Sequence, residues 1–157
     1  MIPPIIAALL LTFSMLYPLP PIPGVEFKSN QITQFEYVPE EAEVIALAQT
    51  LYGECRGCSE LQQKAVCWCV FNRVDDSRFP DSIIKVVSAP NQLQGYSSTN
   101  PVWDNLYEVA YTCIVDWHNG ENRVLDSDMC WFSGWNRINH FRNAWKFEDA
   151  TKFWEEQ

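Results

Sequence analysis

The stretch ALAQTLYGECRGCSELQQKAVCWCVFNRV, residues 46–74, decides the fold, because it joins two helical patterns through a short turn that contains glycine. Its first part completes a helix that we predict over residues 40–53, where Pro39 and a run of acids mark the start. Apolar residues recur three and four positions apart in this segment, which is typical of a helix with one buried face. Gly53 is expected to end the helix, so that a single carboxylate, Glu54, follows at its end.

The second part of the stretch predicts a helix over residues 59–73. Its SELQ start has the pattern of a capping box, with Ser59 as the N-cap and Gln62 reaching back to it. Apolar side chains occupy most of the circumference, so we expect this helix to lie at the centre of the domain. Asn72 and Arg73 end it, and we interpret them as buried polar supports for a site rather than as reacting groups.

Weaker patterns complete a mainly α (α+β) domain with a small β-hairpin. The segment 89–101 is rich in Pro, Asn, Gly and Ser, which predicts a long loop, and long ordered loops often carry function. The other expected elements are a short helix within 79–88, a helix over 102–118, a hairpin around Ser133 and Gly134, and a short amphipathic helix in the last ten residues.

The amino-terminal end has a different composition from the rest of the chain. Residues 1–24 contain a 12-residue apolar run bordered by prolines, which is shorter than a spanning helix and closer to the apolar part of a signal peptide. A signal peptide, an uncleaved membrane anchor and neither of these remain open. Residues 25–38 are interpreted as a linker, and residues 39–157 as the folded domain.

The charge and the cysteines limit the partners. A net charge of −9 without a basic stripe excludes a nucleic-acid partner, but it is compatible with glycan. Cys67 and Cys69 would point about 200° apart on a helix and could not share an ion, so we expect core cysteines, no metal and no cofactor. A disulfide between Cys55 and Cys58 remains an alternative if the chain is exported.

Several ordered motifs resemble the SleB-type cell wall hydrolases, which include the spore-cortex-lytic enzymes. The similarity extends over about residues 42–145. Cys55, Cys58 and Leu93 depart from the usual family residues, but none of these departures removes the central acid. The matching motifs are Tyr52-Gly53-Glu54, Arg56-Gly57, Asn72-Arg73-Val74, Arg78-Phe79-Pro80 and Pro90-Asn91-Gln92-Leu93.

The resemblance implies a lysozyme-like helical fold that acts on peptidoglycan glycan strands. Its members cleave the bond between N-acetylmuramic acid (MurNAc) and N-acetylglucosamine (GlcNAc), commonly as lytic transglycosylases, and Glu54 corresponds to their catalytic acid. Gln92 is expected to contact substrate, and Tyr52, Tyr96 and Trp131 are candidates to pack against sugar rings. The implied location is the cell envelope or the exterior, with membrane attachment possible through the first residues; a phage lysin acting in its host is a further alternative.

One carboxylate suits a transglycosylase, because the C6 hydroxyl of the substrate replaces the water that a second carboxylate would activate. Glu54 must then be protonated when substrate binds, which we expect from apolar neighbours and the helix end. Two alternatives stay open at this point. One is a hydrolase that uses Glu60, Asp75 or Asp76 as its second carboxylate, and the other is an inactive wall-binding domain.

Overall fold

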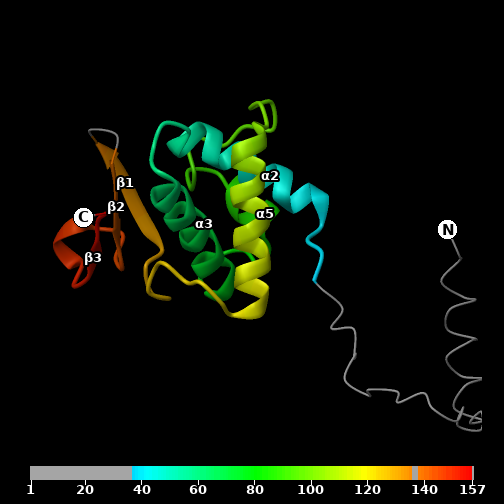
Figure 1. The fold of residues 1–157 in the computed structure, drawn as a ribbon. Coiled ribbons are helices and arrows are strands. Elements are labelled where there is room, and N and C mark those ends of the chain that lie inside the picture. The colour runs from blue at the N-terminus through cyan, green and yellow to red at the C-terminus, as the bar shows by residue number, and fades with distance from the viewer. Residues whose placement is uncertain (1–36, 136–137, 157) are drawn as a thin grey trace, which may run out of the picture. The chain divides into compact units, whose positions relative to one another are not determined.

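The computed structural model describes residues 37–135 and 138–156. These residues form four α-helices, one 3-10 helix and a three-stranded antiparallel sheet, which confirms the expected mainly helical fold with a small β-hairpin (Figure 1). The elements in chain order are α2 (Glu41–Cys55), α3 (Glu60–Asp75), α4 (Ile83–Ser88), α5 (Asp104–Asn119), β1 (Trp131–Trp135), β2 (Ile138–Arg142), η1 (Phe147–Asp149) and β3 (Phe153–Trp154).

Helix α2 begins close to the predicted residue. Glu41 and Glu43 lie in its first turn, where the positive end of the helix dipole favours carboxylates. The helix ends at Cys55, however, and not at Gly53. The expectation that Gly53 stops the helix is therefore wrong, and Glu54 lies within the last helical turn.

Helix α3 is the central helix, as predicted, because every side chain from Ala65 to Arg73 is buried. The Ser59 hydroxyl accepts a hydrogen bond from the backbone N–H of Gln62 at 3.2 Å, which confirms the N-cap. The Gln62 side chain does not return to Ser59. Its Oε1 accepts from the backbone N–H of Asn139 at 2.9 Å, so it ties α3 to β2 and the capping box is only half formed.

The helices pack around one core. Helix α2 contacts α3, α4 and α5, and α3 also contacts α4 and α5. Aromatic rings extend the contact between α3 and α5, since Phe71 lies edge-on to Trp68 and stacks on Trp117 with ring centroids 4.8 Å apart. Gly120 ends α5 in the left-handed conformation, with φ of 72°, which glycine adopts without steric cost.

Strands β1 and β2 form the predicted hairpin, but the turn is not at the predicted place. Ser133 and Gly134 lie inside β1, and Gly134 pairs with Asn139 of β2. A side chain at Gly134 would meet the Asn139 Oδ1 atom at 3.0 Å, so this glycine serves a close approach rather than a turn. The connection between the strands runs through residues 136–137, which lie outside the described residues.

The predicted helix in the last ten residues is wrong. After the 3-10 helix η1, the chain forms strand β3 and pairs with β2. Trp154 pairs with Phe141, and the two rings meet edge to face at 5.4 Å. Phe141 is fully buried, so pairing with β2 gives Trp154 an apolar contact that outweighs the local helical pattern.

The cysteines belong to the core. Cys67 and Cys69 are fully buried on α3, which confirms their interpretation as small core residues. Cys55 carries a free thiol, so the alternative of a disulfide with Cys58 is not realised in this structure. Burial raises the pKa of Cys69 to about 12, which keeps this thiol protonated at neutral pH.

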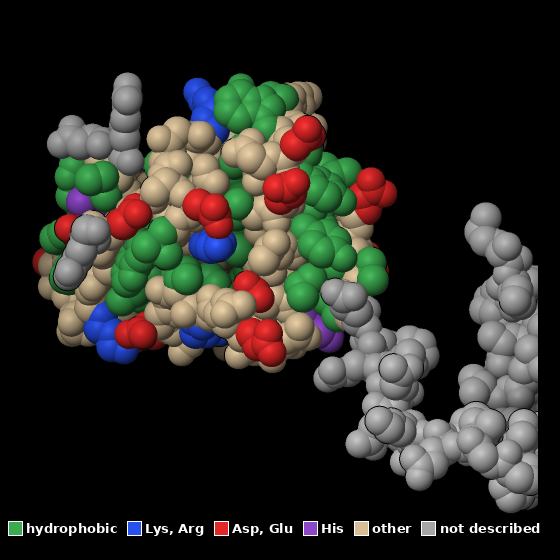
Figure 2. Space-filling view, in the orientation of Figure 1, with side chains coloured by type: hydrophobic (Ala, Val, Ile, Leu, Met, Phe, Trp, Pro, Cys, Tyr) green, Lys and Arg blue, Asp and Glu red, His purple; other side chains and the backbone are tan. Residues whose placement is uncertain are grey.

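The surface bears acids at scattered positions on the face in Figure 2, rather than in one patch. None of the helices within residues 37–135 and 138–156 is both long and apolar enough to cross a membrane. The signal or anchor predicted for residues 1–24, and the linker up to residue 36, lie outside the described residues. Tyr37, the first described residue, stacks its ring on His118 of α5 at 3.6 Å.

Candidate active site

A cleft of about 280 Å³ lies between the end of α2, the loop 89–103 and the β1–β2 hairpin. Three of the predicted site residues line it, namely Glu54, Gln92 and Trp131. They come from a helix, a loop and a strand, so only the tertiary fold brings them together. The other residues that line the cleft are Arg73, Asn91, Gln94, Phe132, Ser133, Gly134, Arg142 and Trp145.

Glu54 is the only carboxylate among the described residues that line this cleft. It is half-buried, and its Oε1 accepts a hydrogen bond from the backbone N–H of Gly95 at 2.7 Å. The bond fixes one carboxylate oxygen and leaves Oε2 without a hydrogen bond to the described residues. A carboxyl group held in this way can present its second oxygen to a ligand in the cleft.

Two glycines make this hydrogen bond possible. A Cβ atom on Gly53 would lie 1.7 Å from the backbone oxygen of Gly95, and one on Gly95 would lie 2.5 Å from the carbonyl carbon of Gly53. Any side chain at either position would therefore push the loop away from α2. The direct contact of the two backbones brings the Gly95 N–H within reach of Glu54.

Amide side chains anchor the same loop to α2. The Gln49 Nε2 donates to the carbonyl oxygens of Ser98 and Asn100, at 2.8 and 3.1 Å. In return, the Asn100 Nδ2 donates to the carbonyl oxygens of Gly95 and Gln49, at 2.7 and 3.0 Å. The sequence analysis did not single out these residues; the available signal was a polar Gln49 in the middle of an otherwise apolar helix face.

Arg73 supports the cleft from α3. It is only 3% exposed, and its Nε donates to the carbonyl oxygen of Cys130 at 2.7 Å. Its Nη1 donates to the Gln92 Oε1 at 3.2 Å, so it also orients the loop amide. Its neighbour Asn72 is buried too and donates to the carbonyl oxygens of Asp126 and Met129. Both residues are the buried polar groups that the sequence predicted.

Trp131 forms part of the cleft wall at the start of β1 and is half-buried. Its ring lies near that of Phe79, and the Arg78 guanidinium lies 5.0 Å from the Trp131 ring centroid. The indole is thus held on one side by protein groups while the residue borders the cleft. The indole is therefore suited to pack its planar face against a sugar ring in the cleft.

Comparison with known protein families identifies a match over most of the folded domain. The family model described as cell wall hydrolase matches residues 57–155. The chain belongs to the cell wall hydrolase family. Searches of curated proteins and of solved structures find no significant match. Family membership implies that the domain degrades peptidoglycan, while the matched range begins three residues after Glu54.

Two predicted substrate-binding residues of this cell wall hydrolase do not line the cleft. The Tyr52 ring meets Trp103 edge-on at 5.0 Å and lies beneath the Arg56 guanidinium. Tyr96 is half-buried and packs against the core. The Trp135 ring, on β1, stacks on His140 with centroids 3.3 Å apart. These side chains contact protein groups in the structure.

Sequence reasoning missed a second arginine in the cell wall hydrolase cleft. Arg142, on β2, is 8% exposed, and its Nη1 donates to the Ser133 Oγ at 2.7 Å. Its Nη2 donates to the carbonyl oxygen of Trp145 at 3.0 Å. Trp145 is 68% exposed and borders the cleft, so this bond fixes the backbone of a residue at the cleft edge. No local motif distinguishes Arg142; only the hairpin register aligns it with the cleft.

The acids considered as a second carboxylate lie outside the cleft. Glu60 pairs with Lys64 at 2.7 Å, which lowers the pKa of Glu60. Asp75 accepts from the indole N–H of Trp117. Asp76 accepts several hydrogen bonds from Arg78, which lower the pKa of Asp76 and stabilise the loop after α3.

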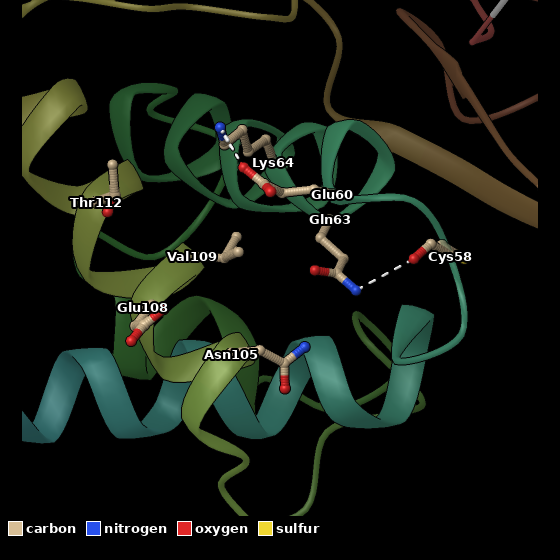
Figure 3. Close-up of a pocket in the computed structure, with 8 residues that line it drawn as sticks. All are labelled: Cys58, Glu60, Gln63, Lys64, Asn105, Glu108, Val109 and Thr112. Carbon is tan, nitrogen blue, oxygen red and sulfur yellow. Dashed lines mark hydrogen bonds and ion pairs between the residues drawn. The ribbon is translucent and has the colours of Figure 1, made fainter.

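A larger hollow of about 380 Å³ lies between α3 and α5 (Figure 3). Lys64 pairs there with Glu60, and the Gln63 Nε2 donates to the carbonyl oxygen of Cys58 at 3.3 Å. The hollow holds neither the predicted acid nor any residue predicted to bind substrate. Its size alone therefore does not make it the active site. The residues that line it are Cys58, Glu60, Gln63, Lys64, Asn105, Glu108, Val109 and Thr112.

Proposed function

We propose that this domain is a SleB-type lytic transglycosylase of peptidoglycan, with Glu54 as its single acid and base. The bond that it cleaves is the one between MurNAc and GlcNAc. The product is a 1,6-anhydro-MurNAc end. The observation that carries the proposal is the setting of Glu54: one oxygen is held by Gly95 and no second carboxylate lines the described part of the cleft.

The reaction proceeds in two proton transfers through the same side chain. Protonated Glu54 gives its Oε2 hydrogen to the glycosidic oxygen, the C1–O bond of MurNAc breaks, and GlcNAc leaves with a new hydroxyl. Positive charge then develops at C1 and its ring oxygen. The C6 hydroxyl of the same sugar attacks C1, and the Glu54 carboxylate takes its proton, which restores the acid. The hydrogen bond from Gly95 occupies Oε1 and leaves Oε2 available for both transfers, which supports this route.

The absence of a second cleft carboxylate favours this route over a hydrolase. Inverting and retaining hydrolases both need a second acid facing the scissile bond. Glu54 has none among the described residues of the cleft, whereas an internal nucleophile needs no activated water. The family fits a cell-envelope or extracellular location, and we propose export through residues 1–24, as a signal peptide or an anchor.

Replacing Glu54 by Gln tests the assignment. Glutamine keeps an oxygen to accept from Gly95, so folding should be retained, but its amide has no acidic proton to transfer to the glycosidic oxygen. We expect release of fragments from purified peptidoglycan to fall by at least a hundredfold, as general acid–base catalysis contributes about 10²–10⁴. The matched control is Glu41→Gln, the same change at an exposed position in the first turn of α2.

Mass spectrometry of the digest identifies the reaction. Anhydro ends support the transglycosylase, reducing ends would mean a hydrolase, and binding without products would mean a wall-binding domain. Undiminished release by the Glu54→Gln protein would reject Glu54 as the acid.

A further inference from the structure

Two guanidinium groups lie inside the same cleft as Glu54. Arg73 is 3% exposed and Arg142 is 8% exposed, and both line the cleft. They come from α3 and β2, two elements that the Gln62–Asn139 hydrogen bond joins. Burying an arginine that remains charged is unfavourable unless an anion or several hydrogen bonds compensate it.

Neither guanidinium has a carboxylate partner among the described residues. Arg73 donates to the neutral oxygens of Cys130 and Gln92, and Arg142 donates to those of Ser133 and Trp145. The ion pairs of the described domain use other cations, on Lys64, Arg78, Lys85, His140 and Lys152.

The lack of a partner does not come from a lack of acids. The chain has 20 acidic and 11 basic residues, and the acids are abundant on the surface in Figure 2. Glu54 borders the same cleft but forms no ion pair with either guanidinium. Two buried positive charges therefore line a cleft in which they have no anionic partner among the described residues.

The two arginines hold neighbouring parts of the cleft lining. Arg73 donates to Gln92 and Arg142 donates to Ser133, and all four residues line the cleft. The positive charges of both arginines also oppose the rise that burial causes in the pKa of the Cys69 thiol. A guanidinium matches the geometry of a carboxylate, with which it can form two parallel hydrogen bonds.

We infer that Arg73 and Arg142 form a subsite for a carboxylate group of the glycan substrate, beside the bond that Glu54 cleaves. The inference rests on the proposed function, because peptidoglycan is the polymer that supplies the anion. Two sources share this chemistry, the lactyl carboxylate of a peptide-free muramic acid and the carboxylates of an attached stem peptide. The subsite would align the muramic sugar in the cleft and distinguish it from the uncharged GlcNAc.

Binding to the Glu54→Gln protein tests the subsite without depending on turnover. The probe is a peptide-free glycan strand, prepared by removing the stem peptides with an amidase, and its matched control is the same strand with its lactyl carboxylates converted to neutral amides. We expect the neutral strand to bind about tenfold to a hundredfold more weakly, as expected for losing a hydrogen-bonded charge pair. Equal affinity for the two strands, measured by calorimetry, would show that the subsite does not bind the lactyl carboxylate.

A second pair of strands isolates the peptide source. These strands keep their stem peptides, and in one of them every peptide carboxylate is amidated. A selective loss of affinity in this pair alone assigns the subsite to the peptide. Equal affinity within both pairs would overturn the carboxylate subsite altogether.

Substitution of Arg142 gives an independent test. Arg142→Gln keeps amide donors for Ser133 while removing the charge, and Arg123→Gln makes the same charge change at an exposed arginine outside the cleft. We expect only Arg142→Gln to lose the preference for the charged strand, together with the salt dependence of binding. If both variants keep that preference and unfold at the wild-type urea concentration, Arg142 has no part in the subsite.

The two proposals can fail separately. If wild-type protein releases no fragments from peptidoglycan but the Glu54→Gln protein still prefers the charged strand, the catalytic proposal fails and the subsite stands. If wild-type protein releases anhydro fragments but ignores the carboxylate, only the subsite fails.

Discussion

Replacing Gly53 by alanine should damage the site, although helix propensity alone predicts a gain. Gly53 lies inside α2 and adopts no positive φ, so alanine would normally stabilise the helix by roughly 0.5–1 kcal/mol. Here the added Cβ would lie 1.7 Å from the Gly95 oxygen, whereas ordinary contact begins at 3.4 Å. The two backbones must move apart by about 1.7 Å, and a shift of that size breaks the 2.7 Å hydrogen bond between Gly95 and Glu54.

Two effects set the expected magnitudes. Overpacking a close contact of this kind reduces the free energy of unfolding by about 1–3 kcal/mol. Misplacing a catalytic group by about 1 Å lowers the rate on the order of a hundredfold. We therefore expect Gly53→Ala to unfold at lower urea concentration, and the folded fraction to have a kcat/KM about a hundredfold below wild type.

Gly57→Ala is the matched control. Gly57 lies in the turn after α2, and a Cβ there would meet nothing within 4 Å. Its free energy of unfolding and its activity should stay close to the wild-type values. The measurements are urea unfolding followed by tryptophan fluorescence, and release of soluble fragments from purified peptidoglycan. A Gly53→Ala protein that is fully active and at least as stable as wild type would refute the close backbone contact.

Two further changes test the fold around the site. Ser59→Ala removes the N-cap bond to Gln62 and should lower the free energy of unfolding by about 1 kcal/mol, whereas the exposed Ser127→Ala should leave it unchanged in the same urea titration. Asp76→Asn should lower it by less than about 1 kcal/mol at pH 7, because Arg78 lowers the pKa of Asp76 in the folded state but its own side chain is 58% exposed, so solvent screens the pair. Such a depressed pKa stabilises the fold above the unfolded-state value of about 3.9 and ceases to do so as the pH falls through the folded-state value. The free energies of unfolding of the variant and wild type should therefore converge as the pH falls through the folded-state pKa of Asp76, and a constant difference across the pH range would contradict the ion pair.

Local patterns predicted the helices well, because each helix combines a buried stripe with its own start or stop signal. They failed where a distant partner decides the structure. Gln62 has the sequence position of a capping-box residue, but it bonds to Asn139, which lies 77 residues away. Phe153 and Trp154 fit a helical pattern, but they pair with β2, where Trp154 meets the buried Phe141. A tertiary contact overrides a weak local preference in both cases.

The site follows the same rule. The sequence motif identifies Glu54, and the sequence also predicts that the helix ends at Gly53, just before Glu54, since glycine often ends a helix. The structure gives this glycine another reason, because the helix continues past it and the missing side chain admits Gly95. The acid and the N–H that holds it are 41 residues apart, so no window of sequence contains the pair. A motif can therefore identify the candidate acid, but the backbone contact that orients it follows only from packing the loop 89–103 against α2.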